Sequence, residues 1–221
     1  MNILAIDSAT EACSAALQRA DGEVFGEFEV APRQHARLLP EMLQRILARA
    51  DLPRANIAYC AFTNGPGAFT GIRIAAAQAQ GLGIGLGIPL VPLSTLAVLA
   101  QTAFERHHWT STVAALDARM QEIYWGRYDR DAQGCACLQG RERLGSAADL
   151  EAERTPETGA GHGWLEELRT NADFPLDPEL LPDARAMLPL ARREIDQQRY
   201  CAPQSIRINY LRNRVAEKAR S

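Results

Sequence analysis

The first 30 residues carry apolar runs that predict three β-strands joined by tight turns. These runs span residues 2–8, 13–20 and 23–30, with short polar segments between them. Asp21 and Gly22 separate the second run from the third, and an Asp-Gly pair between apolar runs is typical of a two-residue hairpin. The chain is therefore expected to begin with three strands that are close neighbours.

A helical period replaces this pattern in residues 38–47. Six apolar residues fall on one side of this segment and charged or amide residues on the other, which predicts an amphipathic helix with Pro40 in its first turn. The resulting order, βββαβαβα, is typical of a ribonuclease-H-like half-domain. The later elements of this order are a buried strand at 57–62, a helix of small residues at 72–85, a strand at 88–93 and a helix at 94–106.

The second half of the chain is patterned more weakly. Residues 112–119 and 122–130 alternate well enough to pair as a hairpin. The stretch 140–183 is rich in proline, glycine and charge, so we expect loops there with one short helix around 164–169. A last helix is expected at 184–197. The predicted domains are an N-terminal ribonuclease-H-like lobe, residues 1–107, and a smaller, loop-rich C-terminal lobe, residues 108–221.

Composition is that of a soluble globular protein. Of 221 residues, 47% are hydrophobic and 23% are charged, and no apolar segment has the form of a leader or a membrane span, so we expect a cytoplasmic protein. The five cysteines form no disulfide framework, and Cys135 and Cys137 lack the spacing of zinc ligands. A net charge of −3 argues against a nucleic-acid surface over the whole molecule, so any RNA contact is expected to be local.

The segment NGPGAFTGIRIA, residues 64–75, is a glycine-rich loop between a predicted strand and a predicted helix. A Walker loop needs a lysine and a hydroxyl residue after its last glycine, but Ile72 follows Gly71. A dinucleotide-binding loop has the spacing G-x-G-x-x-G, and the series Gly65, Gly67, Gly71 is one residue too long. Neither standard phosphate-binding motif is present.

Two interpretations of this loop remain. In the first, the glycines form a rigid turn, Thr70 caps the following helix and Phe69 packs onto Ile74. In the second, the N-terminus of the helix offers backbone N–H groups to an anion or a nucleotide. The spacing of the glycines favours the first interpretation and leaves the second open.

The helix that follows the loop has faces with almost no side chains. Another element can therefore approach it closely, either the sheet of the same lobe or a helix of another subunit. The apolar helix at 38–47 would supply a second surface to such a subunit. Small residues recur at intervals of four in two series, Gly71-Ala75-Ala79 and Ala77-Gly81-Gly85.

Five segments distributed along the chain form a recognisable set: AIDSATEACSAAL, QHARLLPEM, GPGAFTGIRIAAAQAQGLG, LDARMQEIYWGRY and NYLRNRVA. In this order they resemble the TsaB family, bacterial subunits that take part in making threonylcarbamoyladenosine in tRNA. The likeness runs from Met1 to Ala216 and is weakest between Gly140 and Asp183. It implies an α/β, actin-like (ASKHA) fold of two ribonuclease-H-like lobes, with mixed sheets flanked by helices.

The resemblance also implies a function. In this family the paralogue TsaD transfers the threonylcarbamoyl group to the adenosine beside the anticodon, TsaB binds TsaD as a heterodimer, and the ATPase TsaE joins them. The implied role is a noncatalytic scaffold that binds no cofactor on its own, with ATP and magnesium used by the complex. Contact with tRNA would then occur through the complex. Whether the chain forms a homodimer without its partner stays open.

Some residues depart from the family pattern. Ala36 and Ala68 stand where serines are usual, and Ile208 and Asn209 precede the YLR sequence where a proline is common. The missing hydroxyl at position 68 weakens the second interpretation of the loop. The metal-binding histidine pair of TsaD is also missing, because residues 92–101 contain no histidine, and we expect no metal site.

An actin-like ATPase would hold magnesium with carboxylates at the ends of the first strand of each lobe, where Asp7 and Asp117 stand. The alternative function is therefore a degenerate ATP-binding enzyme of the sugar-kinase and Hsp70 class. The candidate nucleotide-binding residues are Asp7, Ser8, Thr10, Gly65, Gly67, Thr70, Gly71 and Asp117. The candidate partner surface consists of Leu39, Met42, Ile46, Gly71, Ile74, Ala75, Gln78 and Ala79. The basic residues near the C-terminus either form a solvated terminal helix or contact tRNA, and any affinity of the chain alone for tRNA is expected to be weak and salt-dependent. These residues are Arg199, Arg207, Arg212, Arg214, Lys218 and Arg220.

Overall fold

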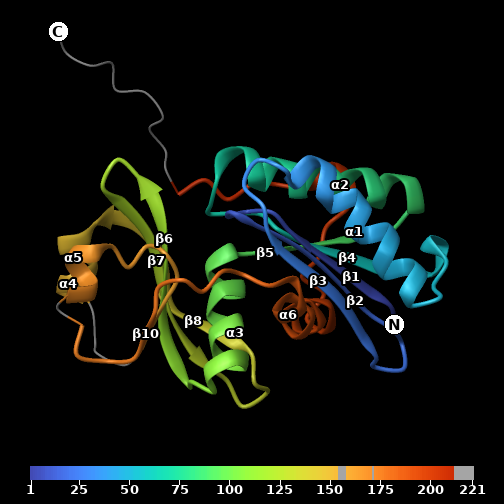
Figure 1. The fold of residues 1–221 in the computed structure, drawn as a ribbon. Coiled ribbons are helices and arrows are strands. Elements are labelled where there is room, and N and C mark those ends of the chain that lie inside the picture. Colours follow the sequence, from blue (N-terminus) through green and yellow to red (C-terminus); the bar gives the residue numbers. More distant parts are fainter. Residues whose placement is uncertain (154–157, 171, 212–221) are drawn as a thin grey trace, which may run out of the picture.

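The computed structural model describes residues 1–153, 158–170 and 172–211, and these residues form two five-stranded sheets (Figure 1). In the first sheet the order is β3-β2-β1-β4-β5. The strands β1 to β3 are antiparallel to one another, whereas β4 and β5 run parallel to β1. Their bounds are β1 (Ile3–Asp7), β2 (Ala12–Gln18), β3 (Val24–Val30), β4 (Tyr59–Thr63) and β5 (Leu90–Leu93).

Helices cover both faces of the first sheet. On one face lie α1 (His35–Arg49) and α2 (Phe69–Leu86), and on the other lies α6 (Ala184–Asp196) (Figure 1). All five residues of β1 are buried between these layers. No helix that the structure describes combines the length and the apolar character needed to cross a bilayer.

The second sheet is also mixed, with the order β10-β9-β6-β7-β8. Its strands are β6 (Ser111–Arg119), β7 (Glu122–Arg130), β8 (Ala136–Ser146), β9 (Gly159–Ala160) and β10 (Leu176–Asp177). The short helices α4 (Ala147–Glu153) and α5 (Glu166–Thr170) lie on the outer side of this sheet (Figure 1). The helix α3 (Thr95–His107) packs on its inner side. Two short 3-10 helices, Arg54–Asn56 and Pro203–Ser205, complete the described elements.

The helices α3 and α6 lie between the sheets and join them into one core. This core contains Ile3 of the first sheet, Phe104 of α3, Leu116 of the second sheet and Met187 of α6. The predicted boundary after residue 107 coincides with the passage from α3 to the second sheet. The described part of residues 108–221 does not belong to one lobe, however, because α6 and the segment around Cys201 and Pro203 pack on the first sheet and α2. The first lobe is therefore the first sheet with α1, α2 and α6, and the second lobe is the second sheet with α3, α4 and α5.

Most predicted elements are confirmed. The order βββαβαβα and the hairpin of β6 and β7 are present. The helix α1 begins at His35, so Pro40 lies in its second turn and not in its first. The prediction of loops in residues 140–183 is wrong in part, because it misses β8, α4 and the short strands β9 and β10. β8 is an edge strand whose side chains are mostly exposed or half-buried, so it carries no apolar alternation that would reveal it.

Candidate functional site in the cleft between the lobes

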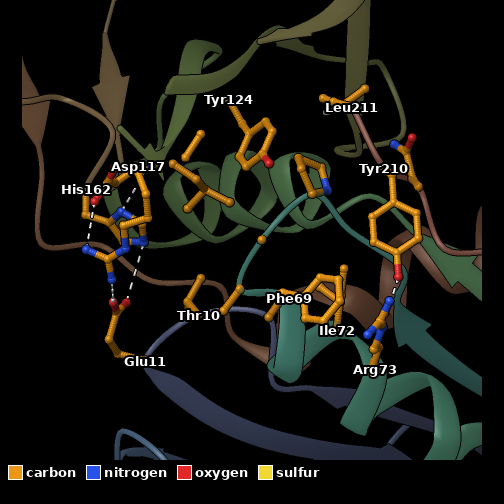
Figure 2. A pocket seen from close by; sticks show the side chains of 18 residues that line it. Thr10, Glu11, Phe69, Ile72, Arg73, Asp117, Tyr124, His162, Tyr210 and Leu211 are labelled. Carbon is orange, nitrogen blue, oxygen red and sulfur yellow. Dashed lines mark hydrogen bonds and ion pairs between the residues drawn. The ribbon is translucent and has the colours of Figure 1, made fainter. Parts of the chain in front are cut away.

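A cleft of about 660 Å³ lies between the two lobes (Figure 2). Its lining comes from five separate parts of the chain. The loop after β1, the start of α2, the β6–β7 hairpin, the loop after β9 and the end of the described chain all contribute. The side chains labelled in Figure 2 are Thr10, Glu11, Phe69, Ile72, Arg73, Asp117, Tyr124, His162, Tyr210 and Leu211.

Glu11 connects the lobes at one end of the cleft. Its carboxylate lies 3.6 Å from a guanidinium nitrogen of Arg119 and 3.5 Å from Nε2 of His162. Asp117 accepts hydrogen bonds from the backbone N–H and the guanidinium of Arg119, at 2.7 and 3.0 Å. The backbone N–H of Asp117 donates to Nδ1 of His162 at 3.0 Å. Burial lowers the pKa of His162, which favours the neutral ring that this acceptor role requires.

Arg73 forms the other end of the cleft with two aromatic side chains. Its guanidinium carbon lies 3.4 Å from the centroid of the Phe69 ring, and its Nε donates a hydrogen bond of 3.0 Å to the Tyr210 hydroxyl. The two rings are in contact as well, with centroids 6.4 Å apart. Stacking and hydrogen bonding together hold the guanidinium in one orientation.

The C-terminal segment closes one side of the cleft by bridging the lobes. The backbone N–H of Asn209 donates to the carbonyl oxygen of Asn64 at 2.7 Å, and its side chain donates to Glu142 of β8 at 3.3 Å. Glu142 also accepts a hydrogen bond of 2.6 Å from the Tyr128 hydroxyl and one from the hydroxyl of Ser94, which caps α3. One carboxylate therefore ties the second sheet to α3 and to the C-terminal segment.

The glycines of the loop 64–75 allow backbone segments to pack closely. A Cβ atom at Gly67 would lie 2.4 Å from the carbonyl oxygen of Ala9, and one at Gly71 would lie 2.0 Å from the carbonyl oxygen of Ser8. Both distances are far shorter than any ordinary contact with backbone. These glycines are thus required by the packing of the loop on the residues after β1, which supports the first interpretation, a rigid turn.

The start of α2 differs from the prediction. The helix begins at Phe69 and its N-cap is Ala68, so Thr70 lies inside the first turn and does not cap the helix. Phe69 is 54% exposed and lies against the guanidinium at the end of the cleft, while Ile74 packs against the core of the first lobe. The backbone N–H of Ala68 donates to the carbonyl oxygen of Ala9 at 2.8 Å and is therefore not available to an anion.

Asp7 is fully buried and does not line the cleft. Its Oδ1 accepts hydrogen bonds from the Thr63 hydroxyl at 2.6 Å and from the backbone N–H of Ala9 at 3.1 Å. Desolvation is the largest cause that raises the pKa of Asp7 from 3.8 to about 6, and the negative charge of Asp183 adds to the rise. The first of the two predicted magnesium ligands is therefore closed off from a ligand in the cleft.

The other predicted nucleotide-binding residues lie in the interior or in the cleft, except Thr70, which is exposed and outside the cleft lining. Ser8 is fully buried, and its hydroxyl donates a hydrogen bond of 2.8 Å to the carbonyl oxygen of Gly71. Gly65 lies against the backbone of Asn209, which a Cβ atom would meet at 2.6 Å. The predicted residues that do line the cleft are Thr10, Gly67 and Asp117.

No three His, Cys, Asp or Glu residues of the described chain are arranged to hold a metal ion. His35 is buried in α1. His107 lies 2.8 Å from the carboxylate of Asp177 and stacks on Trp109, with ring centroids 4.4 Å apart. His35 and His107 therefore lie on different helices, α1 and α3, and of these two only His107 has a carboxylate partner among the described residues.

The predicted partner surface lies largely inside the chain, which corrects that prediction. On α2 the first series of small residues faces the sheet, because the lack of side chains lets the helix lie close to β4. Ile74 and Gln78 are half-buried. The predicted residues that are buried in the chain's own core are Leu39, Met42, Ile46, Gly71, Ala75 and Ala79.

The second series of small residues on α2 faces solvent. Ala77, Gly81 and Gly85 are exposed, and Ile84 beside them is 58% exposed. A Cβ atom at Gly81 or Gly85 would meet no atom within 4 Å. The open side of α2 is therefore a nearly flat surface; we call these four residues the outer face of α2.

Residue patterns alone missed most side chains that define the cleft. A signal for them was present, however, because all but His162 belong to the segments that carry the family resemblance. His162 lies in the weakly patterned stretch 140–183. The missed residues are Glu11, Arg73, Arg119, Tyr124, His162 and Tyr210.

Comparison with known proteins relates the whole chain to proteins of tRNA modification. The family model of TsaD, tRNA N6-adenosine threonylcarbamoyltransferase, matches residues 28–151. The tRNA threonylcarbamoyladenosine biosynthesis protein TsaB of Escherichia coli is 39% identical over 99% of this chain and 97% of its own length. The TsaB protein of Haemophilus influenzae is 35% identical over 99% of this chain and 96% of its own length.

Solved structures confirm the fold. YeaZ from Pseudomonas aeruginosa has a TM-score of 0.83 and 37% identity, covering 92% of this chain and 96% of its own. A second crystal structure, described as an uncharacterized protein from Pseudomonas aeruginosa with similarity to the peptidase YeaZ, has a TM-score of 0.87 and 37% identity, covering 96% and 99%. Together with the two mixed sheets flanked by helices, these matches confirm the predicted α/β, actin-like fold.

Proposed function

Because the chain belongs to the TsaB family of tRNA threonylcarbamoyladenosine biosynthesis proteins, we propose that it is a noncatalytic subunit that supports threonylcarbamoyl transfer to tRNA by binding TsaD. Membership of the family gives the biosynthetic role. The partner and the absence of chemistry on this chain are the proposed parts. The proposal includes TsaE as a third member of a cytoplasmic complex and assigns tRNA contact to that complex.

The outer face of α2 is the observation that carries this proposal. Its small residues leave the helix backbone accessible, so a helix of a partner can lie close against it. Ile84 supplies an exposed apolar side chain on this face, next to Gly85. Gly81 and Gly85 also cost helix stability, since glycine is the least favourable residue in a helix interior after proline. A role in binding would explain why such residues stand on an exposed helix.

The state of Asp7 supports a noncatalytic role. A magnesium-dependent nucleotide site in an actin-like fold needs an accessible carboxylate at the end of the first strand. Here this carboxylate is fully buried, bonded to Thr63 and Ala9, and its raised pKa reflects the cost of charging it. The glycine-rich loop is packed on the same segment, which keeps the site closed.

Titration of TsaD with the purified chain tests the proposal. In the variant Gly81→Arg, a long charged side chain stands where the partner helix would lie, so we expect TsaD affinity to fall at least about 100-fold, or roughly 3 kcal/mol. The matched control is Ala152→Arg, because Ala152 is an exposed residue of α4 on the second lobe. Both variants should keep the circular dichroism and the melting temperature of the wild type. Unchanged TsaD affinity in a folded Gly81→Arg variant would show that the outer face of α2 is not the binding surface.

The alternative, a degenerate ATP-binding enzyme, has one observation in its favour. Thr10, Gly67 and Asp117 line the cleft between the lobes, where actin-like ATPases bind nucleotide. Calorimetry with Mg-ATP and an assay of ATP turnover by the isolated chain decide the matter. Asp117→Ala is a better control than Asp7→Ala, because Asp117 is at the cleft and Asp7 is in the interior. Turnover that Asp117→Ala abolishes would replace the scaffold proposal.

A further inference from the structure

The cleft has the size and the lining of a small-molecule site. Its volume of about 660 Å³ is within the range of roughly 300–1,000 Å³ that is common for ligand pockets. Tyr124 and Ile72 lie between its two ends, and Phe69 lies beside Ile72 at the Arg73 end (Figure 2). Together these residues present two aromatic rings and an aliphatic side chain, which suit a flat apolar group.

The Arg73 end of the cleft is prepared for an anion. The guanidinium is held by the Phe69 ring and by the Tyr210 hydroxyl, which engages only Nε. Within residues 1–153, 158–170 and 172–211, the structure gives the two terminal nitrogens of Arg73 no hydrogen-bond or ion-pair partner. A planar guanidinium with two free donors binds a carboxylate or a sulfonate in two-point fashion. Because its orientation is already set, little side-chain entropy is lost on binding.

The opposite end of the cleft disfavours a second negative charge on the ligand. Glu11 and Asp117 both present carboxylates there, and Arg119 is paired with both of them. His162 does not add a cation, because burial lowers its pKa. A polyphosphate that spans the cleft would therefore bring charge next to two carboxylates. The charge pattern limits the ligand to one acid group, at the Arg73 end.

We propose that the cleft binds a small molecule that combines a flat apolar ring system with a single acid group, the rings between Phe69 and Tyr124 and the acid on Arg73. This site is separate from the outer face of α2 and does not depend on the proposed scaffold role. The ligand class is an aromatic carboxylic or sulfonic acid, and not a nucleoside triphosphate.

Two fluorescent probes with the same ring system test this proposal directly. Anilinonaphthalene sulfonate carries one negative charge, and phenyl-naphthylamine has the same rings without a charge. In the wild type we expect one saturable site for the sulfonate, with an affinity about tenfold above that of the uncharged probe. The variant Arg73→Gln should lose this difference and keep the affinity for the uncharged probe. The control Arg37→Gln removes an exposed arginine of α1 that pairs with Glu41, and it should change neither affinity.

A second variant tests the location of the probe. Ala68 lines the cleft and is exposed, so the larger side chain in Ala68→Phe should occupy space between the lobes and weaken the binding of both probes. Circular dichroism and thermal melting test whether this variant is folded. If Ala68→Phe does not fold, the comparison of Arg73→Gln with the wild type is the test of the proposal. The proposal is overturned if the sulfonate does not saturate, if Arg73→Gln binds it within about twofold of the wild type, or if folded Ala68→Phe leaves both affinities unchanged.

Discussion

Thr63 donates a hydrogen bond of 2.6 Å to Oδ1 of Asp7, and both residues are fully buried, at the ends of the neighbouring strands β4 and β1. Oδ2 of the same carboxylate has no hydrogen-bond partner among the described residues. One hydrogen bond from Thr63 and one from the backbone of Ala9 do not offset the lost hydration, so the pKa of Asp7 stays raised, at about 6. At neutral pH this carboxylate is charged, and its buried charge lowers the stability of the folded state.

The pH dependence of stability should reveal this cost. A raised pKa means that the folded state binds the proton of Asp7 more tightly than the unfolded state does. Protonated Asp7 therefore contributes to the free energy of unfolding below pH 3.8, and this contribution is lost as the pH rises through about 6. The loss over this interval is roughly 3 kcal/mol. Urea unfolding at a series of pH values should show that Asp7→Asn removes this part of the profile, because asparagine keeps the acceptor for Thr63 and carries no charge. Parallel profiles for the two proteins would contradict the raised pKa.

Substitution by alanine should have opposite effects on the free energy of unfolding at two glycines of α2. A Cβ atom at Gly81 meets open space, so Gly81→Ala should raise the free energy of unfolding by roughly 0.5–1 kcal/mol through helix propensity. A Cβ atom at Gly83 would lie 2.7 Å from Pro203 and 3.0 Å from Leu90, so Gly83→Ala should lower it by about 1–3 kcal/mol. Thermal and urea unfolding of both variants measure these changes. If Gly83→Ala were more stable than the wild type, the segment at Pro203 would have to shift at little cost to make room for the methyl group.

Glu142 should hold the lobes and the C-terminal segment together. In Glu142→Ala the buried hydroxyl of Tyr128 loses its acceptor and Asn209 loses its contact with β8, which should cost roughly 2–3 kcal/mol of stability. Hydrogen exchange of residues 206–211 should become faster in the same variant. Glu142→Gln keeps an acceptor oxygen and serves as the milder control. Equal exchange in Glu142→Ala and the wild type would mean that other contacts hold the segment.

The basic C-terminal residues should give the isolated chain only a weak, salt-sensitive affinity for tRNA. Arg199 is already paired with Glu194 at 2.6 Å, which leaves five of the six basic residues. Five phosphate contacts predict a slope of log K against log salt of about −5 at most. Four of these residues lie beyond Leu211, outside the described residues, so truncation after Leu211 should reduce the slope to about −1. Filter binding at several salt concentrations measures it, and a tight, salt-resistant complex would contradict the prediction.

Local patterns predicted α1 and the hairpin of β2 and β3 because their signals come from neighbouring residues. The apolar period of α1 follows directly from its contact with the sheet, and the Asp21-Gly22 turn needs only its two neighbouring strands. β8 and α4 were missed because most of their described side chains are exposed or half-buried, so burial left no period in their sequence. The family motifs identified the fold without any local pattern.

The sequence by itself determined the fold class, the family and the segments that would matter, since motifs and periodicity are properties of neighbouring residues. Only the tertiary structure decided how those segments meet. It turned Ala75 toward the core and Gly81 toward solvent, buried Asp7, and brought Glu11, Arg119 and Arg73 to one cleft from elements far apart in the chain. The physical reason is that burial and charge pairing depend on distances across the fold, and chain spacing carries no information about them beyond a few residues.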